Sequence, residues 1–136
     1  MKKTACVFGL VIATLTVVGL AQTEQDYQTW MKSTASTVGS LKKNVEAKMG
    51  DPAAADADKL AGIFKQVGEF WQKRGGADDA VGLAQKAATA ASAISAAAKA
   101  GNMDQASAEL RNLNSTCGGC HMLHRERLEG GGFKIK

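Results

Sequence analysis

Two cysteines and a histidine close to the C-terminal end are the residues of this sequence best suited to chemistry. They form the segment Cys117-Gly118-Gly119-Cys120-His121, a C-x-x-C-H pattern. On a helix, the two-residue gap places the thiols about one turn apart, and the next residue projects its imidazole from the same side. Thiols in this arrangement can form a disulfide, bind a metal ion, or form thioethers with the two vinyl groups of a haem. The two glycines would let a flat ring lie close to the backbone.

The surroundings of this motif favour covalent haem over the other two chemistries. C-x-x-C-H is the pattern typical of c-type haem attachment. A thioredoxin-like redox pair needs a βαβ setting, and no strand pattern is evident in the sequence. A structural zinc site needs about four ligands, and the candidates Cys117, Cys120, His121 and His124 crowd into one short segment. An ordinary disulfide leaves His121 unexplained. We therefore predict one covalent haem c per chain, with His121 as the proximal iron ligand.

The N-terminus has the pattern of an export signal. Residues 1–3 are basic at two positions, residues 5–20 carry no charge and are mostly apolar, and Gly19 and Ala21 are small. We expect residues 1–21 to be a signal peptide cleaved after Ala21, which places the protein in the periplasm. An uncleaved anchor is the alternative, although the apolar stretch is slightly short for a full span. A lipoprotein fits less well, because Cys6 lies too early to be a lipid-attachment cysteine.

Cleavage would change what the mature chain can bind. Residues 22–136 would form one domain of 136 − 21 = 115 residues, with Cys117 and Cys120 as its two cysteines. Loss of two lysines lowers the formal charge from +4 to +2. No cluster of lysine and arginine follows one face, which argues against nucleic acid as a partner. Nothing after the signal is apolar enough to span a membrane.

Apolar residues recur every three or four positions in four segments, which is the period of a helix. The chain has a single proline and abundant alanine, a composition that favours helix. Glycines at 130–132 are expected to end the last helix, and residues 133–136 to form a short mobile tail. The expected helices cover about residues 23–49, 53–74, 78–100 and 102–129. Short connections make neighbours antiparallel, so we predict an all-α fold, an antiparallel four-helix bundle with haem attached to the C-terminal helix.

Polar residues near the ends of these segments predict helix caps. Thr23 and Asp26 have the spacing of a capping box at the start of the first helix. Asp51 is expected to cap the second helix, with Pro52 at its first helical position. Asn102 is expected to cap the fourth helix, which carries the C-x-x-C-H motif.

Three features of the sequence resemble a known family. The C-x-x-C-H motif lies close to the C-terminus, residues 120–125 read C-H-M-L-H-R, and residues 99–104 read K-A-G-N-M-D. The second run is similar to the C-H-x-x-(aromatic)-R of the class II cytochromes c, the cytochrome c′ group, and the third to that family's A-G-D-x-D turn before the haem helix. With the pattern of the first helix, the resemblance spans most of residues 23–128. It implies a four-helix bundle whose haem lies inside the bundle, bonded to the last helix.

The resemblance also implies roles for residues of the first helix. The family has R-Q-x-x-L/M there, and this sequence has Y-Q-T-W-M beginning at Tyr27. Met31 thus falls at the residue that faces the distal side of the iron, and Gln28 and Arg125 are expected near the haem. Two positions depart from the family. Tyr27 replaces a cation that could pair with a haem propionate, and His124 stands where the family has Tyr or Phe, so we expect it at the surface or the haem edge.

The identity of the distal ligand separates the functions that the resemblance implies. If Met31 binds the iron, the iron is six-coordinate and low-spin, which suits an electron carrier cycling between Fe(III) and Fe(II) with periplasmic redox proteins as partners. An electron carrier is our first expectation, and we therefore expect that the protein is not an enzyme. If Met31 only fills space, a five-coordinate iron can bind nitric oxide or carbon monoxide. A peroxidase needs a distal acid–base residue, which the first helix lacks. A homodimer is also expected, because family members often dimerise.

Overall fold

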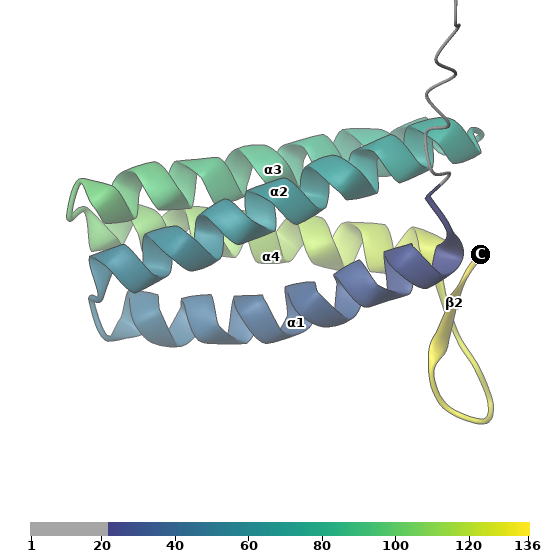
Figure 1. The fold of residues 1–136 in the computed structure, drawn as a ribbon, viewed down its shortest axis with the longest axis horizontal. Helices are drawn as coiled ribbons and strands as arrows, with labels where there is room; N and C mark the ends of the chain where they lie inside the picture. The colour runs from purple at the N-terminus through teal and green to yellow at the C-terminus, as the bar shows by residue number, and fades with distance from the viewer. Residues whose placement is uncertain (1–21) are drawn as a thin grey trace, which may run out of the picture.

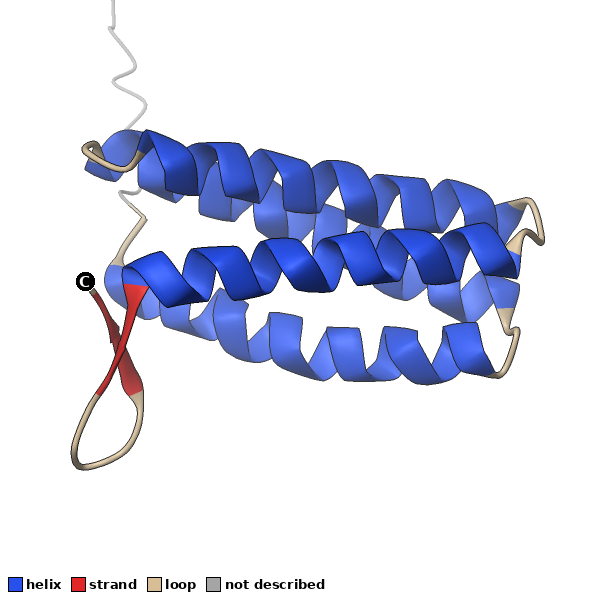
Figure 2. Cartoon of the chain, turned by 180° about the vertical axis from the view of Figure 1, so that it is seen from behind, coloured by secondary structure: helices blue, strands red, loops and turns tan. Residues whose placement is uncertain are grey.

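The computed structural model describes residues 22–136, which form four helices packed side by side (Figure 1). The predicted signal peptide, residues 1–21, lies outside the described residues. Each connection between helices is three residues long, so consecutive helices run antiparallel, as Figure 2 also shows from behind. The predicted all-α, antiparallel four-helix bundle is therefore confirmed. The helices are α1 (Glu24–Glu46), α2 (Gly50–Arg74), α3 (Asp78–Lys99) and α4 (Met103–His124).

The core of the bundle lies mainly between α2 and α3. The inner face of α2 is buried, with Leu60 fully buried and Trp71 only 1% exposed. The facing side of α3 is almost entirely alanine, which lets the two helix backbones approach closely. A Cβ atom placed on Gly68 of α2 would lie 3.6 Å from the Cβ atom of Ala84 on α3. This half of the bundle is therefore tightly closed by small side chains.

Two predicted caps are confirmed at the helices that carry the candidate site. The Thr23 backbone N–H donates to Asp26 Oδ2 at 2.8 Å, and the Asp26 N–H donates to Thr23 Oγ1 at 3.1 Å, which completes the capping box of α1. The hydrogen bonds that the Thr23 backbone N–H and the Thr23 hydroxyl donate to Asp26 Oδ2 hold the pKa of Asp26 below its ordinary value. At the start of α4, the Gln105 N–H donates to Asn102 Oδ1 at 3.1 Å. Both helices thus begin at fixed residues.

The predicted start of the second helix is wrong by one turn. α2 begins at Gly50 and not near Ala53, and the residue at the cap position is Met49, which makes no side-chain cap. Asp51 lies inside the first turn and does not cap the helix, and Pro52 is its third residue. The physical reason is that first-turn amides have no intrahelical acceptor, so a proline fits at several positions of that turn. Met49, the last residue of the range expected for the first helix, is 49% exposed.

The expectation of a longer last helix, a mobile tail and no strands is also wrong. α4 ends at His124, and the chain continues as an antiparallel hairpin of β1 (Arg125–Arg127) and β2 (Phe133–Ile135). Gly131 and Gly132 have φ of 88° and 83° and form the reversal between the strands. Strands of three residues are too short for their alternation to be told from a helical period in the sequence.

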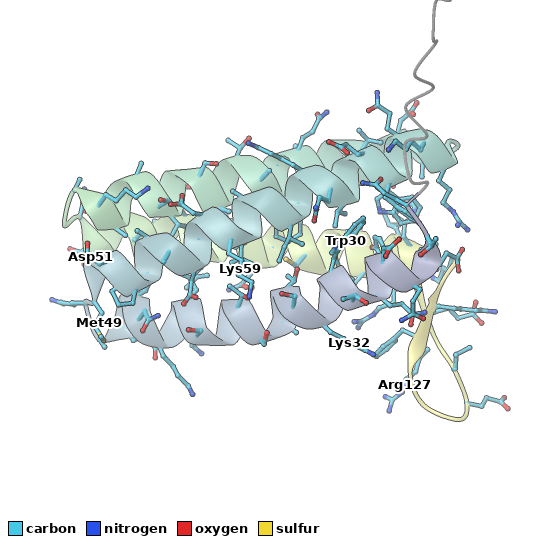
Figure 3. All side chains as sticks on the ribbon, viewed as in Figure 1. Trp30, Lys32, Met49, Asp51, Lys59 and Arg127 are labelled. Carbon is cyan, nitrogen blue, oxygen red and sulfur yellow. The ribbon has the colours of Figure 1, made fainter. Side chains whose placement is uncertain are left out.

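Local contacts stabilise this hairpin and join it to the end of α4. The Arg125 guanidinium lies 4.0 Å from the centre of the Phe133 ring, a cation–π contact. The Lys136 N–H donates to the His124 carbonyl at 3.1 Å, which ties the last residue to the last residue of α4. Figure 3 shows side chains of the hairpin, Arg127 among them, projecting away from the four helices.

Among residues 22–136, no helix is long and apolar enough to cross a membrane.

The close approach of α2 and α3 predicts that alanine substitution at two glycines of α2 changes the stability of the fold in opposite directions. A Cβ on Gly50 would lie 2.8 Å from the Ala98 carbonyl oxygen, whereas a Cβ on Gly62 meets nothing within 4 Å. Gly50→Ala should therefore destabilise the fold by about 1–3 kcal/mol. Gly62→Ala, the matched control in the same helix, should stabilise it by about 0.5–1 kcal/mol. Denaturant unfolding followed by circular dichroism measures both, and equal stability of the two variants would contradict this packing.

Candidate cofactor site

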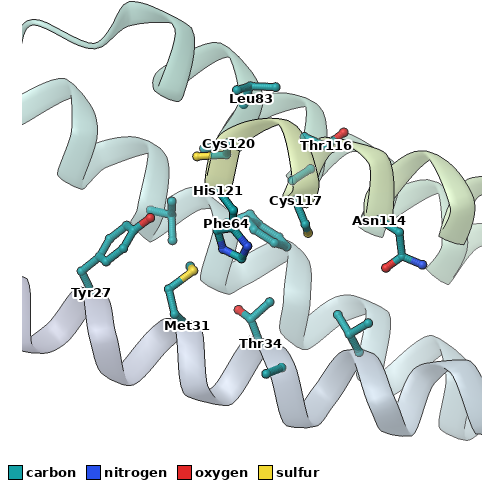
Figure 4. A pocket seen from close by; sticks show the side chains of 15 residues that line it. Tyr27, Met31, Thr34, Phe64, Leu83, Asn114, Thr116, Cys117, Cys120 and His121 are labelled. Atoms are coloured by element: carbon teal, nitrogen blue, oxygen red, sulfur yellow. The ribbon is translucent and has the colours of Figure 1, made fainter. Parts of the chain in front are cut away.

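A cavity lies where α1 and α4 face one another. α1 packs along α2 but touches α4 only sparsely, so this seam of the bundle is less closed than the others. The cavity has a volume of about 190 Å³ and is lined by side chains from all four helices (Figure 4). Its lining includes Tyr27, Met31, Thr34, Val38, Phe64, Val67, Leu83, Ala84, Cys117, Cys120 and His121. All three residues singled out from the C-x-x-C-H motif therefore line one cavity together with Met31.

The last turns of α4 carry the motif into the cavity wall. Cys117, Cys120 and His121 are each half-buried, and both cysteines are free thiols. The helix continues the apolar stripe of Ala106, Leu110 and Leu113, which are buried in the core. Because this stripe faces the bundle interior, the motif that follows it along α4 also faces inward.

Burial keeps both thiols protonated. It raises the pKa of the Cys117 thiol above its ordinary value. Burial, with smaller contributions from the nearby Asp79 carboxylate and from Cys117, raises the pKa of the Cys120 thiol to about 11. A redox-active C-x-x-C pair has the opposite property, because its attacking thiol has a lowered pKa and is largely thiolate. The electrostatics of the pair therefore do not support the alternative of a redox disulfide.

His121 is in the form that binds a metal. Burial, and then the positive charge of Arg125, lower the pKa of the His121 imidazole below its ordinary value. The ring is therefore neutral near pH 7, with a nitrogen lone pair free to bind a metal. Within residues 22–136, no group of three or more His, Cys, Asp and Glu side chains could hold a metal ion by itself. This finding leaves the zinc alternative without a ligand set.

The opposite wall of the cavity belongs to α1. Figure 4 shows the thioether of Met31 extending across the cavity toward the His121 imidazole. Tyr27, one turn earlier, is 8% exposed and also lines the cavity. Burial, with a smaller contribution from the nearby Cys120, raises the pKa of Tyr27 to about 12, so its phenol stays neutral near pH 7. The wall across from the motif is thus a soft sulfur beside an uncharged aromatic residue.

The other residues that the resemblance placed near the haem lie at or beyond the rim. Gln28 is exposed on α1 and is not part of the cavity lining. Arg125 follows the last residue of α4 and is exposed, with its guanidinium against Phe133. Its charge still acts on His121, as the lowered pKa of that imidazole indicates.

His124 makes a contact between helices that sequence reasoning missed. Its Nε2 lies 2.7 Å from Asp79 Oδ2 on α3, and its ring centre lies 4.9 Å from that of Trp71 on α2. The hydrogen bond holds the pKa of Asp79 below its ordinary value. Nothing in the sequence pairs Asp79 with a histidine 45 positions later. His124 does not line the cavity.

Comparison with known proteins shows which known fold the four helices share. The sequence matches no protein-family model and no curated protein. Among solved structures, the chain is similar to the crystal structure of cytochrome c′ from Thermochromatium tepidum, with a TM-score of 0.63 and 22% sequence identity over 72% of this chain and 89% of that chain. The four helices therefore have the arrangement of a cytochrome c′ four-helix bundle.

The raised pKa of Cys120 predicts slow alkylation of the haem-free chain. In residues 22–136 carrying Cys117→Ser, Cys120 should react with iodoacetamide at pH 8 on the order of a hundredfold more slowly than an exposed cysteine, because thiolate is the nucleophile. Its rate should keep rising as the pH approaches about 11, the pKa of this thiol. The matched control carries Ser115→Cys, an exposed position of α4, with both native cysteines changed to serine. A Cys120 rate that levels off near pH 8.5 would contradict the burial of this thiol.

Proposed function

We propose that this chain binds one haem c covalently through Cys117 and Cys120, with His121 on the iron, and that it carries electrons between periplasmic redox proteins. The observation that supports this proposal is the cavity itself. It brings together two neutral thiols, a neutral imidazole and the Met31 thioether, although Met31 lies 117 − 31 = 86 positions before the first cysteine. The cytochrome c′ arrangement of the helices agrees with the proposal.

The residues that are present fit a haem. The thiols come from positions one helical turn apart, as attachment to two vinyl groups requires. Phe64, Val67 and Leu83 supply an apolar wall from α2 and α3. The cavity also contains a buried polar atom, Oγ1 of Thr34, that has no hydrogen-bond partner among the described residues. An apolar chamber with an unsatisfied hydroxyl and metal-binding side chains is what a bound cofactor would complete.

Within this proposal, the chain's residues set the conditions of electron transfer. The haem would supply an iron that gains or loses one electron. His121 and Met31 would determine its potential, because a thioether opposite an imidazole raises the potential of a haem. The apolar side chains around the cavity keep water away and lower the local dielectric. Tyr27 stays protonated near pH 7, since its pKa is raised to about 12, and offers no base for catalysis. We therefore propose no enzymatic activity.

Binding of nitric oxide or carbon monoxide is the second candidate function. The cavity beside Met31 favours it, because a flexible thioether next to open space can move aside for a small ligand. Cleavage after Ala21, a periplasmic location and pairing with a second copy of the chain remain predictions.

The ferric optical spectrum separates the two candidates. If Met31 binds the iron, the purified protein should be low-spin with a sulfur-to-iron charge-transfer band. Met31→Ala should then become high-spin, with a lower reduction potential. Val38→Ala, a smaller loss of volume in the same helix and cavity wall, should keep the low-spin spectrum. A high-spin spectrum in the unaltered protein, with rapid binding of nitric oxide once reduced, would contradict the carrier and support the second candidate.

A further inference from the structure

Thr34 is a buried polar residue in the wall of the candidate site. It is 7% exposed and lines the same cavity as Met31 and His121. Among the described residues, its hydroxyl oxygen has no hydrogen-bond partner. A buried hydroxyl without a partner lowers the stability of a fold, so the position of Thr34 in the wall of this cavity needs an explanation.

Other helical threonines of this chain make a hydrogen bond within the helix that the Thr34 hydroxyl does not make. A threonine inside a helix can donate to the carbonyl four residues earlier, which for Thr34 is that of Trp30. Three helical threonines in the described chain make this bond. They are Thr29 to Gln25 at 2.9 Å, Thr89 to Gln85 at 3.0 Å and Thr116 to Asn112 at 3.0 Å. Thr34 differs from them, and Figure 4 shows its hydroxyl directed into the cavity beside Met31.

We propose that the Thr34 hydroxyl donates a hydrogen bond to a small ligand bound to the iron on the Met31 side. This inference rests on the proposed haem at Cys117, Cys120 and His121. Thr34 lies three residues after Met31, so the two side chains are neighbours on one face of α1. A ligand that takes the place of the Met31 sulfur therefore enters beside the hydroxyl. The class of ligand is a diatomic gas or small anion with a lone pair and partial negative charge on its outer atom.

Tyr27 is the other hydroxyl in the α1 wall, and it is the competing donor. It lies four residues before Met31 and lines the same cavity. Its ring is held in an aromatic cluster, 4.9 Å from the ring centre of Phe70. The inference rests on Thr34 because its hydroxyl oxygen is fully buried and has no hydrogen-bond partner among the described residues.

The test compares variants of the haem-loaded protein that differ by one hydroxyl. Thr34→Val keeps the shape of the side chain and removes the donor, whereas Thr34→Ser keeps the donor. Each is made in the unaltered protein and in Met31→Ala, where the position opposite His121 is open even if Met31 normally fills it. The probes are azide on the ferric protein and carbon monoxide on the ferrous protein.

The expected result in the Met31→Ala background is that Thr34→Val binds azide roughly three- to tenfold more weakly, the effect of losing one hydrogen bond. The infrared C–O stretch of Thr34→Val should move to higher wavenumber. A donor at the outer atom draws electron density into the bound ligand and weakens the C–O bond, and this variant removes the donor. Thr34→Ser should retain the affinity and the stretch of the parent. Without added ligand, Thr34→Val should unfold at a temperature no lower than its parent, because it removes an unsatisfied group.

Three results would overturn the inference. Equal azide affinity and an unchanged C–O stretch in a folded Thr34→Val variant would show that the hydroxyl does not reach the ligand. Loss of affinity in Tyr27→Phe, with none in Thr34→Val, would assign the donor to Tyr27. A lower unfolding temperature of Thr34→Val without ligand would show that the hydroxyl has a partner within the chain. A product that carries no haem at all would instead overturn the proposed function, and this inference with it.

Discussion

The packing of Trp71 sets the spacing between α1 and α4 on which the candidate site depends. Its ring, 1% exposed, meets Tyr27 of α1 edge-on at 5.8 Å between centres and lies 4.9 Å from His124 of α4. The same histidine is held by Asp79 of α3. One aromatic side chain of α2 therefore touches the two helices that face one another at the cavity. Aromatic pairs contribute about 0.5–1.5 kcal/mol each beyond their burial, which makes this end of the bundle a fixed frame for the motif.

The two halves of the bundle use opposite packing to produce one cavity. Alanine on α3 lets α2 approach until the two backbones nearly meet, as at Gly50 and the Ala98 carbonyl. α1 and α4 are instead kept apart, and the space between them is filled in part by Met31 and by the motif residues on α4. Protein interiors are normally close-packed, so a chamber lined by thiols, an imidazole and a thioether indicates a site for a bound group.

Much of this fold could be predicted from the sequence, because a helical period is a local property. The capping box at Thr23 and the cap at Asn102 are local too, and both were predicted correctly. The start of α2 was missed because Pro52 is compatible with several first-turn positions. The C-terminal hairpin was missed because three-residue strands leave too short a pattern, and because Lys136 is tied back to His124 by a backbone bond that no sequence pattern encodes.

The candidate site could be predicted only where its residues are contiguous. Cys117, Cys120 and His121 form a motif, whereas Met31 was placed opposite them by resemblance to a family. Thr34 follows Met31 by three positions, and a polar residue at this spacing was the available signal that it does more than pack. Which cross-helix contacts form depends on how each helix is rotated about its axis, and the hydrophobic period fixes that rotation only to within a broad apolar face.

The most direct test of the central claim is the intact mass of the chain secreted by a host able to attach c-type haem. We predict the mass of residues 22–136 plus one haem, with the haem retained through extraction by acidified organic solvent. Changing both Cys117 and Cys120 to serine should abolish this retention. Secreted protein with the mass of bare polypeptide, or with haem that the solvent removes, would contradict covalent attachment at these cysteines.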